Sequence, residues 1–595
     1  MAAIGEAPGH LAAISKSRMP AFLCALALLL CALATYPVAE IGTNDDWSYA
    51  QSARVLAQTG HIVYNGWATA MLGWQLYLGA LFIKLFGPSF TTLRASTLLV
   101  AVATAILTQR ILIRAGINPR NATIGTLAFV LSPLFLPLAL SFMSDMGGLF
   151  CVVVCLYACL RALQAQTDRA VFGWLAFAAL SNAVGGTVRQ IAWLGVLVMF
   201  PCAVWLLRRR PHVLTFGAIL YAICLLIVFG SNHWFLQQPY SVPDSLPAGL
   251  PRFHALLQLG VKMTSLFFSG VLLVLPILIA FVPAVSFRNP RSVAFLLVGA
   301  LCETGCIYVF LTHGFTHDLL TAPFKGNYVS QYGLADEPMI KGAPPLVFSF
   351  GCRVFLTFVV FTVLVCFLVW FAASRRIAQP ADAREQIFQP ISLTSLLILL
   401  VPFVIAYVVL LIPRGLSWDV LFDRYLLLLL PIALLLLLRL YQDRVRPDLP
   451  PVSSALVLLF AIYAVAGTHD NFSKYRAFQT AINELRGAGI SDAAIDAGFE
   501  RNAITQVWRS GYINYPHVRL PATPLIMQPP IFPEGCKPFL YWLVPAIVPG
   551  YALSFDPNAC GGLSKFSPVT YPEWLIARSV PIYIVNTVKP GNAER

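Results

Sequence analysis

Charged residues are scarce in this sequence: they make up 11% of its 595 residues, while 58% are hydrophobic. A soluble domain carries about 25% charged residues, so the composition excludes an ordinary soluble protein. Apolar segments of about 20 residues recur between residues 20 and 468, and a segment of that length crosses a bilayer as a helix. The sequence therefore predicts a mainly α-helical protein with many membrane spans.

Acidic residues are also few, and cysteines are rare outside the apolar runs. The chain has 26 acidic and 40 basic residues, which gives a net charge of +14. This excess does not indicate a nucleic-acid partner, because much of it is arginine in short loops between apolar runs, the pattern that specifies membrane topology. Most of the 13 cysteines lie inside apolar runs, where a thiol behaves as a small apolar group. Cys536 and Cys560 lie in the polar C-terminal part, where they either pair as a disulfide in an oxidising compartment or remain two free thiols.

The first apolar run, residues 20–39, follows Lys16 and Arg18. A basic segment followed by an apolar one is compatible with a cleavable signal peptide and with an uncleaved first helix. The run reaches bilayer length and no soluble domain follows it, so we expect the helix to be retained.

The distribution of arginine fixes the expected topology. Apolar runs lie at 20–39, 71–87, 93–114, 121–141, 146–165, 169–186, 188–207, 212–234, 260–285, 291–312, 348–373, 391–413, 420–439 and 452–468, and the loops with clustered arginine are 114–120, 161–169, 208–210, 286–291, 374–384 and 439–446. All of these loops fall on the cytoplasmic side only when the run 71–87 does not cross the membrane. That run has 17 residues and contains Gln75 and Lys84, as an interfacial helix would. We therefore expect about 13 spans.

This layout places the N-terminus in the cytoplasm and the chain in the plasma (inner) membrane. Residues 1–468 form the membrane domain, and residues 469–595 form a small extracytoplasmic α/β domain. In the second domain the patterning predicts a helix at 471–489 and short buried strands at 493–498 and 580–586.

The long connections all fall on the outer side in this layout. They include the loop 40–92, which contains the interfacial helix, and the loops 235–259, 313–347 and 414–419. The inner loops are short and basic. Since long loops tend to carry function, we expect the functional site at the outer face.

Three carboxylates lie at outer helix ends. Asp45 and Asp46 occur in the stretch IGTNDDWSYA, and Asp145 occurs in SFMSDMGGLF. Each could cap the helix that follows it, because aspartate is a favoured N-cap residue. A carboxylate close to the hydrocarbon is costly, however, and is usually functional or paired. The expected topology brings all three to one membrane face although they are far apart in the sequence, which favours a site.

Several basic residues lie at the outer face against the positive-inside pattern, so they need another reason. They are Arg189 in GGTVRQIAWLG, Lys325 in PFKGNYVSQYG, Arg414, and Arg424 beside Tyr425 in FDRYLLLLLP. A guanidinium group binds phosphate through its planar fork, and an arginine with a tyrosine at a helix mouth suits a lipid phosphate. The alternatives are interfacial snorkelling for Arg189 and a structural contact between Asp423 and Arg424.

The stretch LTHGFTHDLL contains His313, His317 and Asp318. The spacing of the two histidines on a helix is compatible with a metal site. One such pair arises easily by chance, so a loop without a metal is the favoured interpretation. Glu303 is the main acidic residue deep inside an apolar run, and we expect it to have a structural partner rather than a transport role.

These motifs resemble those of GT-C-fold glycosyltransferases of the protein O-mannosyltransferase and lipid A aminoarabinose transferase type, broadly glycosyltransferase family 39. The resemblance covers about residues 20–468 and rests on DDWSY in the first outer loop, SFMSD at the next outer turn, TVRQ and DRYLLLLLP. The stretch IDAGFERNA is similar, more weakly, to the extracytoplasmic tail of bacterial members. The family usually has glutamate at the second acid of the first pair, where this chain has Asp46.

The resemblance implies an inverting enzyme that depends on a polyprenyl-phosphate-linked sugar donor. It implies Asp45 as general base, and it matches Asp46 and Asp145 to the family's further acids, which we expect to be catalytic. We expect a substrate-binding group made of Tyr49, Arg189, Lys325, Arg414, Arg424 and Tyr425. Such an enzyme must hold the acceptor, remove a proton from its hydroxyl group and stabilise the departing phosphate. Arginine and lysine side chains, or a bound divalent metal cation, can offset the phosphate charge. The expected partners are the donor, a glycan, lipid or protein acceptor, and membrane lipids.

Two other functions are compatible with a polytopic chain. A transporter or flippase of a lipid-linked saccharide requires ionisable residues at the bilayer midplane and internal repeats, and the sequence offers mainly Glu303 and no clear repeat. A non-catalytic scaffold of the same fold has no need for Asp45 and Asp145. The glycosyltransferase is therefore the favoured function.

Overall fold

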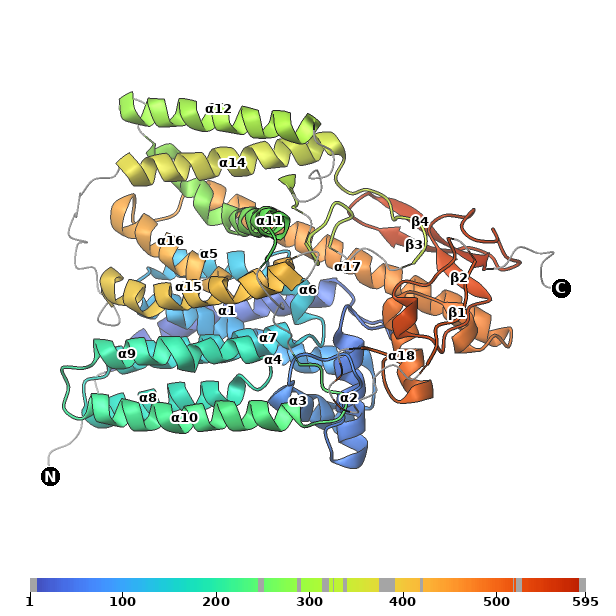
Figure 1. Ribbon diagram of the computed structural model, residues 1–595. Helices are drawn as coiled ribbons and strands as arrows, with labels where there is room; N and C mark the ends of the chain where they lie inside the picture. The colour runs from blue at the N-terminus through green and yellow to red at the C-terminus, as the bar shows by residue number, and fades with distance from the viewer. Residues whose placement is uncertain are drawn as a thin grey trace.

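The computed structural model describes residues 8–243, 251–285, 290–312, 320–324, 326–334, 340–373, 391–417, 421–516, 518, 520, 527–533 and 535–587. These residues are mainly helical, and a small sheet lies near the C-terminus, in agreement with the sequence-based expectation (Figure 1). Most of the long helices run along one common direction, with the sheet at one end of them (Figure 1).

The helices and strands follow one another in a simple order. The α-helices are α1 (Pro8–Ala34), α2 (Asp46–Thr59), α3 (Gly73–Phe86), α4 (Phe90–Arg114), α5 (Pro119–Val130), α6 (Phe135–Ala139), α7 (Ser144–Gln164), α8 (Asp168–Gly185), α9 (Phe200–Leu206), α10 (Val213–Leu236), α11 (Phe253–Leu278), α12 (Pro290–Thr312), α14 (Phe350–Ala373), α15 (Leu393–Ser417), α16 (Leu430–Arg444), α17 (Pro451–Gly487) and α18 (Phe499–Ser510). Short 3₁₀ segments are η1 (Gln190–Trp193), η3 (Ile279–Ala284), η5 (Asp423–Leu428), η6 (Asp492–Ala494) and η7 (Tyr541–Leu543), and η2 (Gly195–Met199) is a π-helix. The strands are β1 (Ile495–Asp496), β2 (Tyr551–Ser554), β3 (Val569–Glu573) and β4 (Arg578–Asn586).

Seven helical segments within the described ranges are long and apolar enough to cross a membrane. They are α4, α7, α10, the continuous segment of α11 and η3, α14, α15 and α17, and three shorter apolar helices add to them. These candidate spans agree with the expectation of many apolar helices of bilayer length, whereas the count of about 13 stays a prediction. With 14 residues, α3 is only about 21 Å long, which is less than the roughly 30 Å of the hydrocarbon core. This length suits the non-spanning helix expected at 71–87.

Three apolar runs that the sequence presents as continuous helices are broken in the structure. The run 121–141 divides into α5 and α6, the run 188–207 into η1, η2 and α9, and the run 420–439 into η5 and α16. A proline lies within or just after each break, at positions 133, 201 and 431. Proline has no backbone N–H and its ring clashes with the preceding turn, so it interrupts the regular helical hydrogen bonds. Hydrophobicity alone does not reveal these breaks.

The C-terminal part begins inside a helix. The last apolar run continues without interruption through residue 468 as α17, so the helix expected at 471–489 is the second half of this long helix. The sheet has the strand order β1-β2-β4-β3, in which β1 and β2 are parallel and the other neighbours are antiparallel. The strands expected at 493–498 and 580–586 are confirmed as β1 and β4. Strand β3 packs beside α17, which joins the sheet to the helices.

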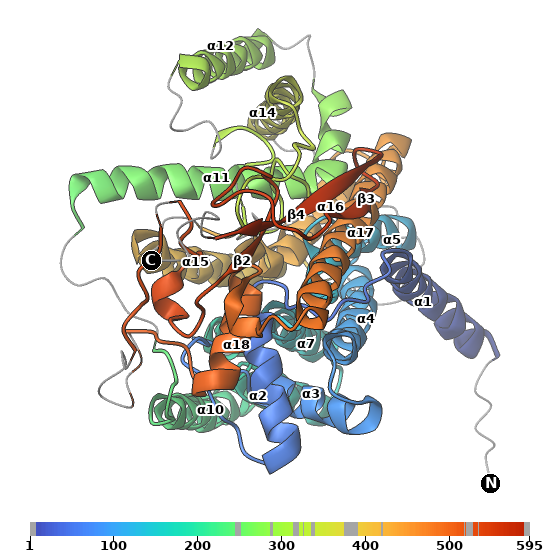
Figure 2. The ribbon, with the colours of Figure 1, turned by 90° about the vertical axis from the view of Figure 1, so that its right-hand side faces the viewer.

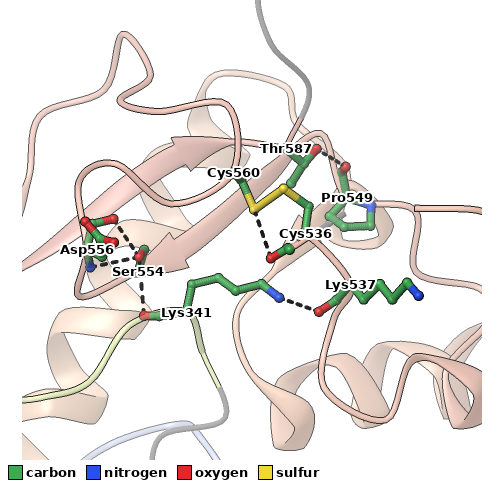
Figure 3. The surroundings of a disulfide bond; sticks show 9 residues. Lys341, Cys536, Lys537, Pro549, Ser554, Asp556, Cys560 and Thr587 are labelled. Carbon is green, nitrogen blue, oxygen red and sulfur yellow. Dashed lines mark hydrogen bonds between the residues drawn. A yellow bond between two sulfur atoms is a disulfide. The ribbon is translucent and has the colours of Figure 1, made fainter. Parts of the chain in front are cut away.

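A disulfide joins Cys536 and Cys560 across 24 positions of the chain (Figure 3). In a chain-entropy account, closing a loop of this length stabilises a protein by about 3–4 kcal/mol. Close to this bond, the Lys341 ammonium group donates to the carbonyl of Lys537, and the Ser554 hydroxyl donates to the carbonyl of Lys341 at 3.3 Å (Figure 3). The segment that contains Lys341 is thereby attached to the C-terminal sheet.

The basic loops gather at one end of the helices. Guanidinium groups connect them: Arg114 donates to Gln164 at 2.9 Å, Arg210 to the carbonyl of Ala165 at 2.8 Å, and Arg439 to the carbonyl of Gly116 at 2.8 Å. This agrees with the expectation that loops 114–120, 161–169, 208–210 and 439–446 share one side. The loops 286–291 and 374–384 lie mostly outside the described residues.

The loops expected at the outer face meet at the opposite end, which is the end that carries the sheet. The backbone N–H of Gly66 donates to Tyr240, that of Ile513 donates to Asn65, and the Gln190 amide donates to Thr69, all to carbonyl groups and at 2.7–3.0 Å. Seen from this end, α2 lies across the direction of the long helices, with α18 beside it (Figure 2). The loop 40–92 and the C-terminal part therefore cover the same end of the helices.

Candidate functional site

Asp45 lies at this covered end, directly before α2. Its Oδ1 accepts a hydrogen bond from the indole of Trp67 at 2.9 Å, and its Oδ2 lies 3.1 Å from the guanidinium group of Arg424. Asp45 occupies the N-cap position, yet its side chain makes no capping bond. The capping interpretation is therefore wrong for this carboxylate. The Asp45 side chain remains 21% exposed, so a ligand can reach it.

Arg424 is the residue that connects Asp45 to its surroundings. One of its guanidinium nitrogens pairs with Asp45, and the other donates to the side-chain oxygen of Asn44 at 3.0 Å. The alternative contact between Asp423 and Arg424 is absent from the described ion pairs, because the Asp423 carboxylate is occupied elsewhere. Arg424 therefore clamps the start of α2 to η5.

Asp46 is buried completely, and its environment differs from that of Asp45. Its two carboxylate oxygens accept from the backbone N–H groups of Thr43 at 2.6 Å and Phe142 at 3.2 Å. These bonds join the segment before α2 to the segment before α7, so Asp46 does not cap α2 either. Burial raises the pKa of Asp46 to about 6, although the Arg94 charge and the two backbone bonds favour the ionised form.

The variant Asp46→Asn is expected to lose stability in a pH-dependent way. The amide offers one acceptor, so its NH₂ group must face one of the two backbone N–H groups, and a buried donor without a partner costs about 1–3 kcal/mol. Because the pKa of Asp46 is higher in the folded protein than in the unfolded chain, ionisation weakens the wild type as the pH rises from about 4 to about 6, by up to about 3 kcal/mol. The advantage of the wild type over the variant should therefore shrink over this window, as measured by thermal unfolding in detergent. An advantage that grows with pH would contradict this account.

Asp145 and Arg189 form a second ion pair, with 2.5 Å between an Arg189 nitrogen and Asp145 Oδ1. Asp145 lies in the first turn of α7, where the N-cap residue is Met143, so its side chain is not the cap. The Asp145 side chain is 1% exposed and that of Arg189 is 18% exposed. Snorkelling does not describe Arg189, because its charge points to a carboxylate rather than to water.

Two tyrosines, Tyr49 and Tyr425, belong to the same region. Burial raises the pKa of Tyr49, so its phenol stays neutral, and the charges of both ion pairs act on it. The Tyr425 hydroxyl accepts from Arg414 Nε at 3.2 Å, and the guanidinium group of Arg189 lies 5.7 Å from the centre of the Tyr425 ring. Tyr425 thus lies between two of the expected phosphate-binding residues.

The two ion pairs together with Arg414 carry one surplus positive charge. Asp45 and Asp145 supply two negative charges, and Arg189, Arg414 and Arg424 supply three positive ones. Asp145 Oδ2 and Arg424 Nε have no hydrogen-bond partner among the described residues. Guanidinium groups such as these three bind phosphate oxygens well.

A buried carboxylate holds a further loop against the site. Asp423 accepts from three successive backbone N–H groups, those of Asn327, Tyr328 and Val329, at 2.7–3.1 Å. Residue 326, directly before Asn327, must be glycine, because a Cβ atom at Gly326 would overlap Asp423 Oδ2. The Asn44 side chain then donates to that of Asn327 at 2.5 Å. The loop 326–329 is therefore attached to both η5 and the start of α2.

Arg94 fixes the chain segment that leads to Asp45. This side chain is 2% exposed, and its guanidinium group donates to the carbonyls of Ala39 and Ile41. The group also lies 5.5 Å from the centre of the Phe90 ring and 5.0 Å from that of Phe472. Arg94 thus connects α4, α17 and the segment before α2.

The expected metal ligands His313, His317 and Asp318, and the cation Lys325, lie outside the described residues, as does the side chain of Glu303. Across the ranges given above, no three His, Cys, Asp or Glu side chains are grouped so that they could hold a metal ion. Asp45 and Asp145 each have an arginine as neighbour instead. The described donor set therefore does not fit a divalent cation.

The structure brings together seven of the residues expected from the sequence: Asp45, Tyr49, Asp145, Arg189, Arg414, Arg424 and Tyr425. It adds residues that the sequence analysis missed. Trp67 and Asn327 carry no signal in the sequence, because their role depends on which loops meet. Arg94 does carry one, since it is a charged residue at the start of an apolar run.

No protein-family model matches the sequence, and no curated protein matches it. In fold, the chain is similar to ArnT from Cupriavidus metallidurans in the apo state, with a TM-score of 0.39 and 14% identity over 95% of this chain and 98% of that one. It is also similar to an Archaeoglobus fulgidus oligosaccharyltransferase, with a TM-score of 0.38 and 14% identity over 89% of this chain and 68% of that one. A third similar structure is the S. cerevisiae protein O-mannosyltransferase Pmt1-Pmt2 complex, with a TM-score of 0.31 and 13% identity over 37% of this chain and only 33% of that one.

Proposed function

We propose that this protein is a membrane glycosyltransferase that moves a sugar from a polyprenyl-phosphate-linked donor to an acceptor hydroxyl or phosphate group. The reaction takes place at the outer face of the plasma membrane and inverts the anomeric carbon. Asp45 is the general base when the acceptor is a hydroxyl group. Residues 1–468 supply the membrane-embedded part and residues 469–595 cover it from outside.

The observation that carries this proposal is the environment of Asp45. It is the one acid of the expected three whose side chain is open to a ligand, and it lies beside Arg424 and an indole donor. Asp145 is buried behind Arg189, and both oxygens of Asp46 are occupied by backbone groups. Asp145 and Asp46 therefore position the site, whereas Asp45 can take a proton from a bound acceptor.

The chemistry follows from this arrangement. The acceptor oxygen forms a bond to the anomeric carbon while the bond from that carbon to the phosphate oxygen breaks, and the lipid phosphate leaves with the bonding electron pair. The acceptor proton passes to Asp45. Arg424, Arg189 and Arg414 offset the charge that develops on the phosphate, and such fixed charges are usually the largest contribution to catalysis. No step in this scheme is routed through a metal ion.

The proposed orientation in the membrane rests on which loops lie at each end of the helices. The basic loops at one end favour the cytoplasm, which leaves the end with Asp45 and the C-terminal part outside. A site at the end of a helical bundle lies at the level of the lipid headgroups. A donor can then keep its polyprenyl chain in the bilayer while its phosphate reaches the arginines.

A transfer assay tests this function. The purified protein in proteoliposomes is given a panel of radiolabelled polyprenyl-phosphate sugars together with an envelope extract as acceptor. We expect one donor to lose its label to the acceptor, with an equal amount of polyprenyl monophosphate released. If the lipid moves across the bilayer and no label is transferred, the protein is a flippase instead. If no donor gives either movement or transfer, a scaffold is favoured.

A further inference from the structure

The two carboxylate oxygens of Asp45 have different neighbours. Oδ2 lies 3.1 Å from the guanidinium group of Arg424, whereas Oδ1 accepts the indole N–H of Trp67 at 2.9 Å. The Trp67 side chain is only partly buried. A donor phosphate suits the side that holds the guanidinium group, which leaves the side of Trp67 for the acceptor.

Trp67 belongs to a group of five neighbouring aromatic rings. Phe499, the first residue of α18, has its ring centre 5.0 Å from that of Trp67, and Tyr515, which follows α18 in the chain, has its ring centre 6.0 Å from that of Trp67. The ring of Trp47 lies 5.9 Å from Trp67 and 6.0 Å from Phe499. The ring of Phe539 lies 6.4 Å from that of Phe499. These five residues are called the aromatic wall below.

The aromatic wall is buried on one side and open on the other. Trp47 and Phe499 are buried, but Phe539 is 46% exposed, and Trp67 and Tyr515 are partly exposed. Single apolar residues on a surface are ordinary, whereas a connected group beside a functional carboxylate indicates a binding surface. A ligand that covers the three open rings gains the free energy of removing them from water. The two buried rings support the three open ones from behind.

Hydrogen bonds and the disulfide hold the segments of the aromatic wall in place. The backbone N–H of Ile513 donates to the carbonyl of Asn65 at 2.7 Å, which joins two of these segments. The side-chain amide of Asn514 donates to the carbonyl of Trp542 at 3.0 Å, which joins a third. The third segment also contains Cys536 of the disulfide (Figure 3). A surface that is preorganised in this way loses little conformational entropy when it binds a ligand.

The chemistry of the aromatic wall favours a neutral saccharide over other ligands. A sugar ring presents C–H groups on its face and hydroxyl groups at its edge, so its face packs on an aromatic ring while its edge stays hydrated. None of the five wall residues is an ionisable acid or base near neutral pH, so a polyanion finds no charge here. An acyl chain belongs at the level of the membrane helices, but α18 lies beyond their ends (Figure 1). A peptide in an extended form needs a strand edge with free backbone groups, which rings do not supply.

We infer that the acceptor is a saccharide, whose sugar rings pack on Trp67, Tyr515 and Phe539 while one of its hydroxyl groups reaches Asp45. This inference rests on the proposed transfer reaction and names its acceptor class. The hydroxyl oxygen forms a bond to the anomeric carbon of the donor sugar, and its proton passes to Asp45. The polyprenyl phosphate leaves with the bonding electron pair. The product is the same saccharide extended by one sugar unit.

The first test changes the most exposed ring of the aromatic wall. With the carbohydrate fraction of an envelope extract as acceptor, Phe539→Ala should raise KM for the acceptor by about 3–10-fold, the value of one aromatic contact. The values of kcat and of KM for the donor should not change, whereas a merely structural role would lower kcat or the unfolding temperature. Phe539→Tyr should keep the wild-type KM. The matched control is Trp508→Ala, because Trp508 is 49% exposed and contacts Gln51 and Arg501 instead.

A second test identifies the acceptor class from the product. After transfer with the whole envelope extract, the labelled product is digested with protease and extracted with organic solvent. The label should stay with carbohydrate through both steps. Label found on peptides, or on a lipid that has no saccharide part, would overturn the saccharide acceptor and leave the proposed function intact.

A third test examines the aromatic wall without the reaction. The protein in lipid nanodiscs is mixed with neutral hexasaccharides of glucose, mannose or N-acetylglucosamine, and its aromatic protons are saturated in an NMR experiment. Saturation should reach the C–H groups of at least one saccharide in the wild type and in Trp508→Ala, and it should fall in Phe539→Ala. No signal from any saccharide, or equal signals in Phe539→Ala and the wild type, would overturn the wall as the acceptor site. A protein that shows this binding but transfers no sugar from any donor would refute the proposed function and leave the wall as a saccharide-binding surface.

Discussion

Replacing Asp45 by asparagine is expected to reduce sugar transfer by about 10³-fold or more. An amide cannot accept a proton from the acceptor, and general-base catalysis contributes about 10²–10⁴-fold. The amide oxygen can still accept from Trp67, so the wall of the site keeps its shape. The loss should therefore appear in kcat, with little change in KM for the donor, when transfer of label is measured with saturating acceptor.

The matched control for this variant is Asp168→Asn. Asp168 also forms an ion pair with an arginine, at 2.8 Å from Arg210, but it belongs to the basic end of the helices and its side chain is 51% exposed. This control should transfer sugar at the wild-type rate. If Asp45→Asn were as active as the control, the base would have to be another group. A phosphate acceptor gives a different result, because it needs no base and both variants would then be active.

Replacing Arg424 by lysine is expected to lower kcat by about 10²–10³-fold, the effect of losing one well-placed stabilising donor. Lysine keeps the charge, but its ammonium group cannot reproduce the planar fork that reaches Asn44 and Asp45 together. Asp45 then loses its orientation and the departing phosphate loses a donor. The effect should be seen in single-turnover measurements, which separate the chemical step from donor binding.

Arg210→Lys serves as control for Arg424→Lys, since Arg210 pairs with Asp168 at the opposite end of the helices. Both variants are first compared with the wild type by thermal unfolding, so that a loss of folding is recognised. Retention of the wild-type single-turnover rate in a folded Arg424→Lys variant would exclude Arg424 from the stabilisation of the phosphate. In the double variant with Asp45→Asn, Arg424→Lys should cause little further loss of rate, because the two side chains act as one unit.

Much of the architecture could be predicted from the sequence, for reasons of length and polarity. Apolar runs must form helices in a bilayer, where every backbone polar group needs an internal partner. The clustered arginines correctly grouped the basic loops at one end, and the remaining long loops at the other. The helix breaks were not predicted, because the periodicity of an apolar run is the same on both sides of Pro133, Pro201 or Pro431.

The roles of the individual acids were decided only by the tertiary structure. Asp45 and Asp46 are adjacent and chemically identical, yet one is open and paired with Arg424 while the other is buried on backbone N–H groups. The sequence identifies both as acids at a helix start, but it does not reveal their partners. Asp46 bonds Phe142, about a hundred residues away, and Asp45 pairs with Arg424, nearly four hundred residues away.

The sequence by itself predicted a mainly helical membrane protein, and it predicted that the candidate acids and arginines share one end of the helices. These properties follow from composition and from local order along the chain. The tertiary structure alone placed Trp67 beside Asp45 and Asn327 beside Asn44, and it brought Phe499 of the C-terminal part against Trp67. The physical reason is that burial and ion pairing depend on which distant segments fold against one another. Those contacts decide whether each carboxylate is ionised and whether a ligand can reach it.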